Sequence, residues 1–128
     1  GKSLHYAEDF DHSRLDKLGV PARKIDLMWT QRSCDVPLGI PFNIASYAFL
    51  LHLLAREVNM IPGELIFSGG DCHIYQNQIV GVKQQLKRET FELPKLKLHN
   101  TSIFELKLDD FEIIDYKSSP TIQYPLSN

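Results

Sequence analysis

Two short segments hold most of the side chains with chemical potential, Gln31-Arg32-Ser33 and Gly69-Gly70-Asp71-Cys72-His73-Ile74-Tyr75. The guanidinium of Arg32 next to the hydroxyl of Ser33 suits a phosphate, although an arginine at a strand end more often forms a surface ion pair. If the second segment is extended, His73 and Tyr75 point the same way and offer an imidazole and a phenol to one partner, such as a sugar hydroxyl. The alternative is a glycine bulge with a structurally bonded histidine.

Asn43 and Asp35 each allow two interpretations. Asn43 stands at the start of an apolar stretch, where its amide either caps a helix or presents a donor and an acceptor to a planar base. Residue type alone favours capping. Asp35, two residues before a proline, is either a solvated turn residue or a carboxylate that accepts from the N–H groups of a heterocycle.

The two cysteines, Cys34 and Cys72, are interpreted as structural thiols, because neither has the helix-start or cationic setting that activates a nucleophile. Two cysteines form no disulfide framework, and their spacing excludes a zinc ribbon. A metal site built from His5, His12, Asp9 and Asp11 is rejected, because that region reads as a loop without a rigid surround. No metal site is therefore expected.

The amino-acid composition limits the classes of protein to which this chain can belong. The chain has 128 residues, 43% of them hydrophobic and 10% aromatic, which indicates one folded domain rather than a disordered chain. The net charge of −2 argues against a nucleic-acid partner. No apolar run reaches membrane-spanning length and no signal segment is recognisable, so a cytoplasmic location is the default expectation. The first residue is Gly rather than Met, which favours a processed or excised piece.

Hydrophobic periodicity predicts the elements that must position these residues. Alternation over 24–32 predicts a strand with Ile25, Leu27 and Trp29 on one face and a partly covered second face. Residues 42–58 predict a helix that is apolar nearly all round and therefore buried. The remaining expected elements are a short buried strand over 64–68 closed by Gly69-Gly70, an amphipathic helix over 77–89, and strands over 93–98 and 111–116.

These elements predict an α+β fold in which a mixed sheet packs on one long, buried central helix. Residues 1–23 are expected to be a connecting segment or insertion, with a short helix that ends near Gly19. Ser102 is expected to cap a single turn, and the tail over 117–128 is expected to be extended.

Taken together, four segments closely resemble the thymidylate synthase family. They are Gln31-Arg32-Ser33-Cys34-Asp35, the run Leu38-Gly39-Ile40-Pro41-Phe42-Asn43-Ile44-Ala45-Ser46-Tyr47-Ala48, Pro62-Gly63-Glu64-Leu65 and Gly69-Gly70-Asp71-Cys72-His73-Ile74-Tyr75. The resemblance covers about residues 24–128 and corresponds to the C-terminal part of that enzyme, with the N-terminal half missing.

The resemblance implies synthesis of dTMP from dUMP, with 5,10-methylenetetrahydrofolate as one-carbon donor and reductant. It implies that Arg32 and Ser33 hold the dUMP phosphate, Asn43 the uracil edge, and His73 and Tyr75 the sugar 3′-hydroxyl. It also implies that the folate contacts Asp35, Leu38, Gly39 and Phe42. The family further implies a homodimer formed through the sheets, or pairing with an N-terminal portion of the same enzyme.

Two departures leave alternatives open. The family's nucleophilic cysteine lies in a Pro-Cys-His motif that this chain lacks, so no catalytic residue is assigned here and the chain alone is expected to be inactive. The ending Leu126-Ser127-Asn128 is more polar than the family's usual apolar tail. A dUMP hydroxymethylase, in which water ends the reaction, and a non-catalytic nucleotide-binding remnant are therefore the alternative functions.

Overall fold

The computed structural model describes residues 12–99 and 102–126. Its core unit is a strand, a helix and a second strand: β1 (Lys24–Asp35), α2 (Ile40–Glu57) and β2 (Ile61–His73). The short α1 (His12–Lys17) precedes this unit. The elements that follow are η1 (Gln76–Gln78), α3 (Ile79–Gln85), β3 (Lys95–Leu98), η2 (Leu108–Asp110) and β4 (Phe111–Ile114).

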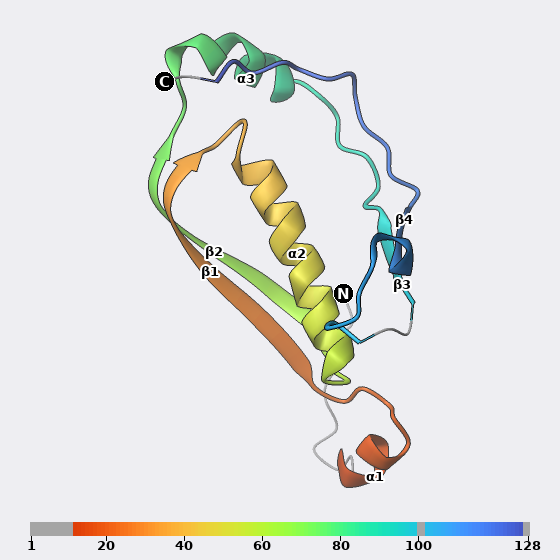
Figure 1. Cartoon of the computed structure of the whole chain (residues 1–128). Coiled ribbons are helices and arrows are strands. Elements are labelled where there is room, and N and C mark those ends of the chain that lie inside the picture. Colours follow the sequence, from red (N-terminus) through yellow and green to blue (C-terminus); the bar gives the residue numbers. More distant parts are fainter. Residues whose placement is uncertain (1–11, 100–101, 127–128) are drawn as a thin grey trace.

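The long strands β1 and β2 pair in parallel, and α2 crosses between them and packs on one face of the pair (Figure 1). The buried ring of Trp29 on β1 fixes this packing, since it lies 4.8 Å from Tyr47 of α2 and 4.8 Å from Phe67 of β2. The predicted strand from Lys24 and its inward face are thus confirmed. The prediction that the second face is partly covered is wrong, because Met28 on that face is 63% exposed.

The described strands do not form the single mixed sheet that the sequence predicted. β1 and β2 form one parallel pair, and β3 and β4 form a separate antiparallel pair. A parallel pair needs a crossover connection, which α2 supplies, whereas the antiparallel β3/β4 pair does not need one. The expectation of a mixed helix-and-strand fold is nevertheless confirmed, and α2 packs against β1 and β2.

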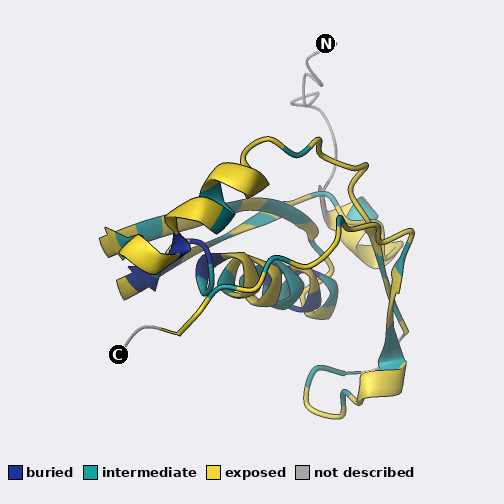
Figure 2. Cartoon of the chain, turned by 90° about the horizontal axis from the view of Figure 1, so that it is seen from above, coloured by how far each residue is buried: buried dark blue, intermediate teal, exposed yellow. Residues whose placement is uncertain are grey.

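Helix α2 is longer but less buried than the sequence predicted. Ile40, Leu51, Leu53 and Ala55 are buried, whereas Phe42 is 73% exposed. The parallel pair covers one side of α2, and the β3/β4 pair lies on the other, where the rings of Phe49 on α2 and Phe111 on β4 have centroids 4.8 Å apart (Figure 1). Between α2 and this pair there is a cavity of about 620 Å³, lined by Ala45, Ala48, Phe49, His52, Pro94, Lys95, Leu96 and Ile113. Figure 2 likewise shows exposed residues along α2.

Asn43 does not cap α2, so the capping interpretation is wrong. The cap position is Gly39, which makes no side-chain capping bond, and Pro41 occupies the first turn. Proline suits that turn because its missing N–H has no helical partner there. The helix therefore starts earlier, and Asn43 lies within it with its backbone N–H donating to the carbonyl of Gly39 at 3.1 Å.

Strand β2 passes straight through Gly69-Gly70 instead of ending there. Gly69 pairs with Gln31 across the ladder. A Cβ at Gly69 would lie 2.7 Å from the Phe67 ring and 2.5 Å from the sulfur of Cys72. Position 69 therefore requires glycine because the neighbouring side chains leave no room for a Cβ, and not because the chain turns there.

The β1/β2 ladder contains one irregularity, where Ile25 pairs with Pro62 and Leu27 pairs with Leu65. Gly63 and Glu64 thus face the single residue Asp26, whose carboxylate accepts the backbone N–H of Glu64 at 2.6 Å. A Cβ on Gly63 would lie 2.0 Å from that carboxylate oxygen and 3.0 Å from the Ile25 carbonyl. This bulge therefore depends on glycine.

Replacing Gly63 by alanine is expected to lower the free energy of unfolding by about 1–2 kcal/mol, because the new methyl group displaces the Asp26 carboxylate. Urea denaturation measures the change. In an Asp26→Ala background the same replacement is expected to cost less, since part of the clash is gone. Equal costs in both backgrounds would contradict this account of the bulge.

The remaining elements largely follow the expected order with shorter bounds. The helix predicted over 77–89 is the shorter α3, preceded by the 3-10 turn η1, and the last two strands keep only 95–98 and 111–114. Ser102 caps a single turn as predicted, since its Oγ accepts the N–H of Phe104 at 3.4 Å. The described tail over 117–126 contains no helix or strand.

The first helix ends as predicted near Gly19, which adopts a φ of 67° that favours glycine. The first eleven residues of the expected connecting segment, among them His5, Asp9 and Asp11, lie outside the described residues. The described helices include none that is long and apolar enough to cross a membrane.

Candidate functional site

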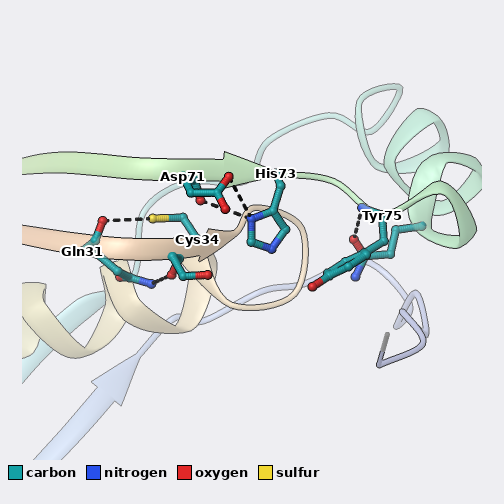
Figure 3. A network of polar contacts seen from close by, with 7 residues as sticks. Gln31, Cys34, Asp71, His73 and Tyr75 are labelled. Carbon is teal, nitrogen blue, oxygen red and sulfur yellow. Dashed lines mark hydrogen bonds and ion pairs between the residues drawn. The ribbon is translucent and has the colours of Figure 1, made fainter. Parts of the chain in front are cut away.

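The candidate residues gather where β1 and β2 end and α2 begins. Because the strands are parallel, their carboxyl ends meet at one edge, a common location for ligand sites. Ser33 pairs with Asp71, and Asp35 pairs with His73. The ladder continues into the β1–α2 loop, where the N–H of Val36 donates to the carbonyl of His73 at 3.0 Å. Figure 3 shows Asp71 and His73 where β2 ends, with Gln31 on the neighbouring strand β1.

Gln31 connects the strand end to α2. Its Nε2 donates to Oδ1 of Asn43 at 3.2 Å and to the Ser33 carbonyl at 2.9 Å. The Trp29 indole donates to its Oε1 at 3.4 Å, so the buried ring fixes the orientation of the Gln31 amide. Asn43 therefore has its acceptor engaged within the protein, while its Nδ2 carries the two donors of a carboxamide.

Gln78 connects the other side of the site. It is fully buried, and its Nε2 donates to Oδ2 of Asp35 at 3.0 Å and to the Pro125 carbonyl at 3.5 Å. Its Oε1 accepts the N–H of Tyr75 at 3.1 Å. One side chain thus ties together the end of β1, the segment after β2 and the C-terminal tail.

Asp35 is not the freely solvated turn residue of the simpler interpretation. Besides Gln78, its carboxylate accepts the backbone N–H of Leu38 through Oδ1 at 3.1 Å. These two bonds hold the carboxylate at the start of the loop to α2. The backbone carbonyl of Asp35 also accepts the N–H of Gly39 at 2.9 Å, which brings the loop back into the helix.

His73 and Tyr75 lie on the same side of the extended segment, as that alternation predicts. Their rings meet edge to face with centroids 5.1 Å apart. The Nδ1 of His73 lies 3.2 Å from the Asp71 carbonyl and 3.6 Å from its carboxylate, which fixes one ring edge (Figure 3). The other ring nitrogen and the Tyr75 hydroxyl remain the groups that can meet a ligand.

The other predicted residues fall into two groups. Arg32 and Ser33 are exposed at the end of β1. Leu38 and Phe42 line an open cavity of about 660 Å³ that is also lined by Gln85, Arg88 and the tail segment 118–124. Gly39 lies between them as the helix cap and does not line this cavity.

Sequence reasoning missed Gln31 and Gln78 as members of the site. Gln31 belongs to the Gln31-Arg32-Ser33 motif, but no role was predicted for it. Its position next to Arg32 could have indicated that it belongs to the site. Gln78 carried no signal, because a glutamine in a polar segment is ordinarily exposed. Within the described ranges 12–99 and 102–126, no group of three or more His, Cys, Asp or Glu side chains is arranged to hold a metal ion.

The comparison with protein families decides the assignment. A family model described as thymidylate synthase matches residues 7–128, nearly the whole chain. The chain belongs to the thymidylate synthase family. The match starts at residue 7, upstream of the resemblance that was recognised over residues 24–128.

Individual relatives agree with this family. A thymidylate synthase of Francisella tularensis subsp. holarctica is 50% identical over 110 residues, 84% of this chain and 40% of that protein. One from Corynebacterium aurimucosum is 48% identical over 114 residues, 88% of this chain and 42% of that protein. The chain therefore spans about 40% of the length of the curated relatives that it matches.

Proposed function

We propose that this chain is the C-terminal, ligand-binding part of a thymidylate synthase. The reaction is the reductive methylation of dUMP to dTMP, with 5,10-methylenetetrahydrofolate as cosubstrate. The observation that carries the proposal is the meeting of Asn43, Asp35, His73 and Tyr75 at one edge of the parallel pair, in a chain of this family.

The nucleotide contacts follow from the chemistry of each group. Arg32 is an exposed, permanently charged fork, and with the Ser33 hydroxyl it binds the phosphate dianion. The Nδ2 of Asn43 donates to a uracil carbonyl oxygen, because Oδ1 is already held by Gln31. His73 and Tyr75 bind the 3′-hydroxyl of the sugar with one donor and one acceptor.

The folate contacts lie on the adjacent side of the same loop. The Asp35 carboxylate accepts from the N–H groups of the pterin, and its bonds to Leu38 and Gln78 hold it in place for that contact. Gly39 has no side chain, so its backbone can approach the folate closely. Leu38 and Phe42 supply apolar surface from the cavity that also contacts the tail. No residue of this chain is assigned as the nucleophile, since the Pro-Cys-His motif does not occur in it.

Partners and location complete the proposal. The outer face of the parallel pair exposes Met28 and Ile66, which fits a homodimer formed through the sheets. An N-terminal portion of the same enzyme is the other expected partner, and it would cover the exposed side of α2. A cytoplasmic location belongs to the same proposal.

A chimera provides the test. The C-terminal 40% of the Francisella tularensis relative is replaced by this chain, and the purified protein is incubated with dUMP and 5,10-methylenetetrahydrofolate. Chromatography with mass spectrometry is expected to identify dTMP, and an Arg32→Ala chimera is expected to lose most of this activity. A 5-hydroxymethyl-dUMP product would instead favour the hydroxymethylase suggested by the polar tail. A folded chimera that binds dUMP without any product would indicate the non-catalytic remnant.

A further inference from the structure

We propose that Cys34 and Cys72 form a cross-strand dithiol site that closes reversibly into a disulfide. The two residues are direct partners in the parallel β1/β2 ladder, and both are free thiols in the structure. Partners on adjacent parallel strands lie about 4.8 Å apart and point to the same side. That spacing falls within the range that a disulfide requires.

The two thiols also influence each other electrostatically. The neighbouring Cys72 side chain raises the pKa of the Cys34 thiol. Gly69 makes room for this arrangement, since a Cβ there would lie 2.5 Å from the Cys72 sulfur. The Cys34 thiol additionally lies 3.5 Å from the Gln31 carbonyl (Figure 3). Formation of the bond therefore requires side-chain rotation rather than movement of the strands.

The two thiols differ in solvent exposure and therefore take different roles in the reaction. Cys34 is fully buried, with 0% of its surface accessible, whereas Cys72 is exposed. An external oxidant therefore meets Cys72 first, and Cys34 acts as the resolving thiol. An isolated exposed cysteine would remain as a mixed disulfide with the oxidant. The buried Cys34 allows that mixed disulfide to be replaced by an internal one.

The reaction with a small disulfide such as oxidised glutathione balances in two exchanges. The Cys72 thiolate attacks one glutathione sulfur, forms a mixed disulfide and releases one glutathione thiol. The Cys34 thiolate then attacks the Cys72 sulfur, forms the Cys34–Cys72 bond and releases the second glutathione. Two protein thiols are oxidised and one glutathione disulfide is reduced to two thiols.

The rate of the second exchange, in which Cys34 attacks the mixed disulfide, is expected to depend on pH. Burial raises the pKa of the Cys34 thiol, and contact with Cys72 raises it further. At neutral pH Cys34 is therefore mostly protonated, and the attacking thiolate becomes more abundant as the pH rises. We expect the rate of ring closure to increase steadily from neutral to alkaline pH.

Intact mass measurement of the full chain after incubation with oxidised glutathione tests the proposal. The wild-type chain is expected to lose about 2 Da and both free thiols, without retaining glutathione. Cys34→Ser is expected to stop as a glutathione adduct at Cys72. Cys72→Ser is expected to keep its buried thiol reduced under the same conditions.

Peptide mapping without reductant provides a measurement that does not depend on the variants folding. It is expected to find a Cys34–Cys72 linkage within one chain, and a reductant is expected to restore both thiols. A stable glutathione adduct on the wild-type chain, a disulfide between two chains, or complete resistance to oxidation would each overturn the proposal.

Discussion

Replacing Gln78 by leucine is expected to lower the free energy of unfolding by about 3 kcal/mol. Leucine has nearly the same size, so the packing volume is kept while all three hydrogen bonds to Asp35, Tyr75 and Pro125 are lost. The cost arises from the groups left behind, because the half-buried Asp35 carboxylate keeps only its bond from Leu38, and the Tyr75 N–H and the Pro125 carbonyl lose the bond to Gln78. Urea denaturation monitored by Trp29 fluorescence measures it.

The matched control for Gln78→Leu is Gln84→Leu, which changes an exposed glutamine on α3. That variant is expected to change the stability by less than about 0.5 kcal/mol. The C-terminal tail provides a second readout, since Gln78→Leu releases the Pro125 carbonyl and is expected to speed proteolysis within 117–126. Equal stabilities of the two variants would contradict the connecting role of Gln78.

Changing Asn43 to aspartate is expected to shift base preference from uracil towards cytosine by on the order of 100-fold in relative kcat/KM. The structure gives the reason. Gln31 donates to one oxygen of residue 43 in either case, so the substitution changes the outward-facing group from an N–H donor to an oxygen acceptor. A uracil carbonyl needs the donor, whereas a cytosine amino group needs the acceptor.

The chimera with the Francisella relative, assayed with dUMP and with dCMP, measures this ratio. Asn43→Ala is the control, because it removes the contact without creating an acceptor. It is expected to weaken the use of both nucleotides without favouring dCMP. Unchanged base selectivity in Asn43→Asp would remove residue 43 from the base-reading role.

Local patterns predicted the elements better than they predicted the ends and the burial of those elements. The alternation of Ile25, Leu27 and Trp29 requires a strand with one inner face, and the structure has it. Glycines misled the prediction of β2, because Gly69 and Gly70 serve close packing within the strand rather than a turn. The prediction of a buried α2 failed for another reason: an apolar circumference predicts cover all round, whereas Phe42 and Ile44 are exposed in the described chain.

The site could be predicted only in part for a related reason. Arg32, Asn43, Asp35, His73 and Tyr75 belong to segments whose resemblance to a family is legible in the sequence. Gln31 hydrogen-bonds to Asn43, which is 12 positions away in the sequence, and Gln78 hydrogen-bonds to Asp35, which is 43 positions away. Such long-range bonds leave no periodicity, so their roles appear once the parallel pairing brings the segments together.

Titration of the isotope-labelled chain with dUMP, followed by backbone amide NMR, shows whether the nucleotide binds where β1 and β2 end. Weak binding with a Kd on the order of millimolar is expected, because this chain is only a part of the relatives' length. The account predicts shifts concentrated at Ser33, Asn43, His73 and Tyr75, and smaller shifts with deoxyuridine, which lacks the phosphate. Shifts confined to α1 or to the β3/β4 pair, or none at millimolar dUMP, would contradict a nucleotide site at the ends of β1 and β2.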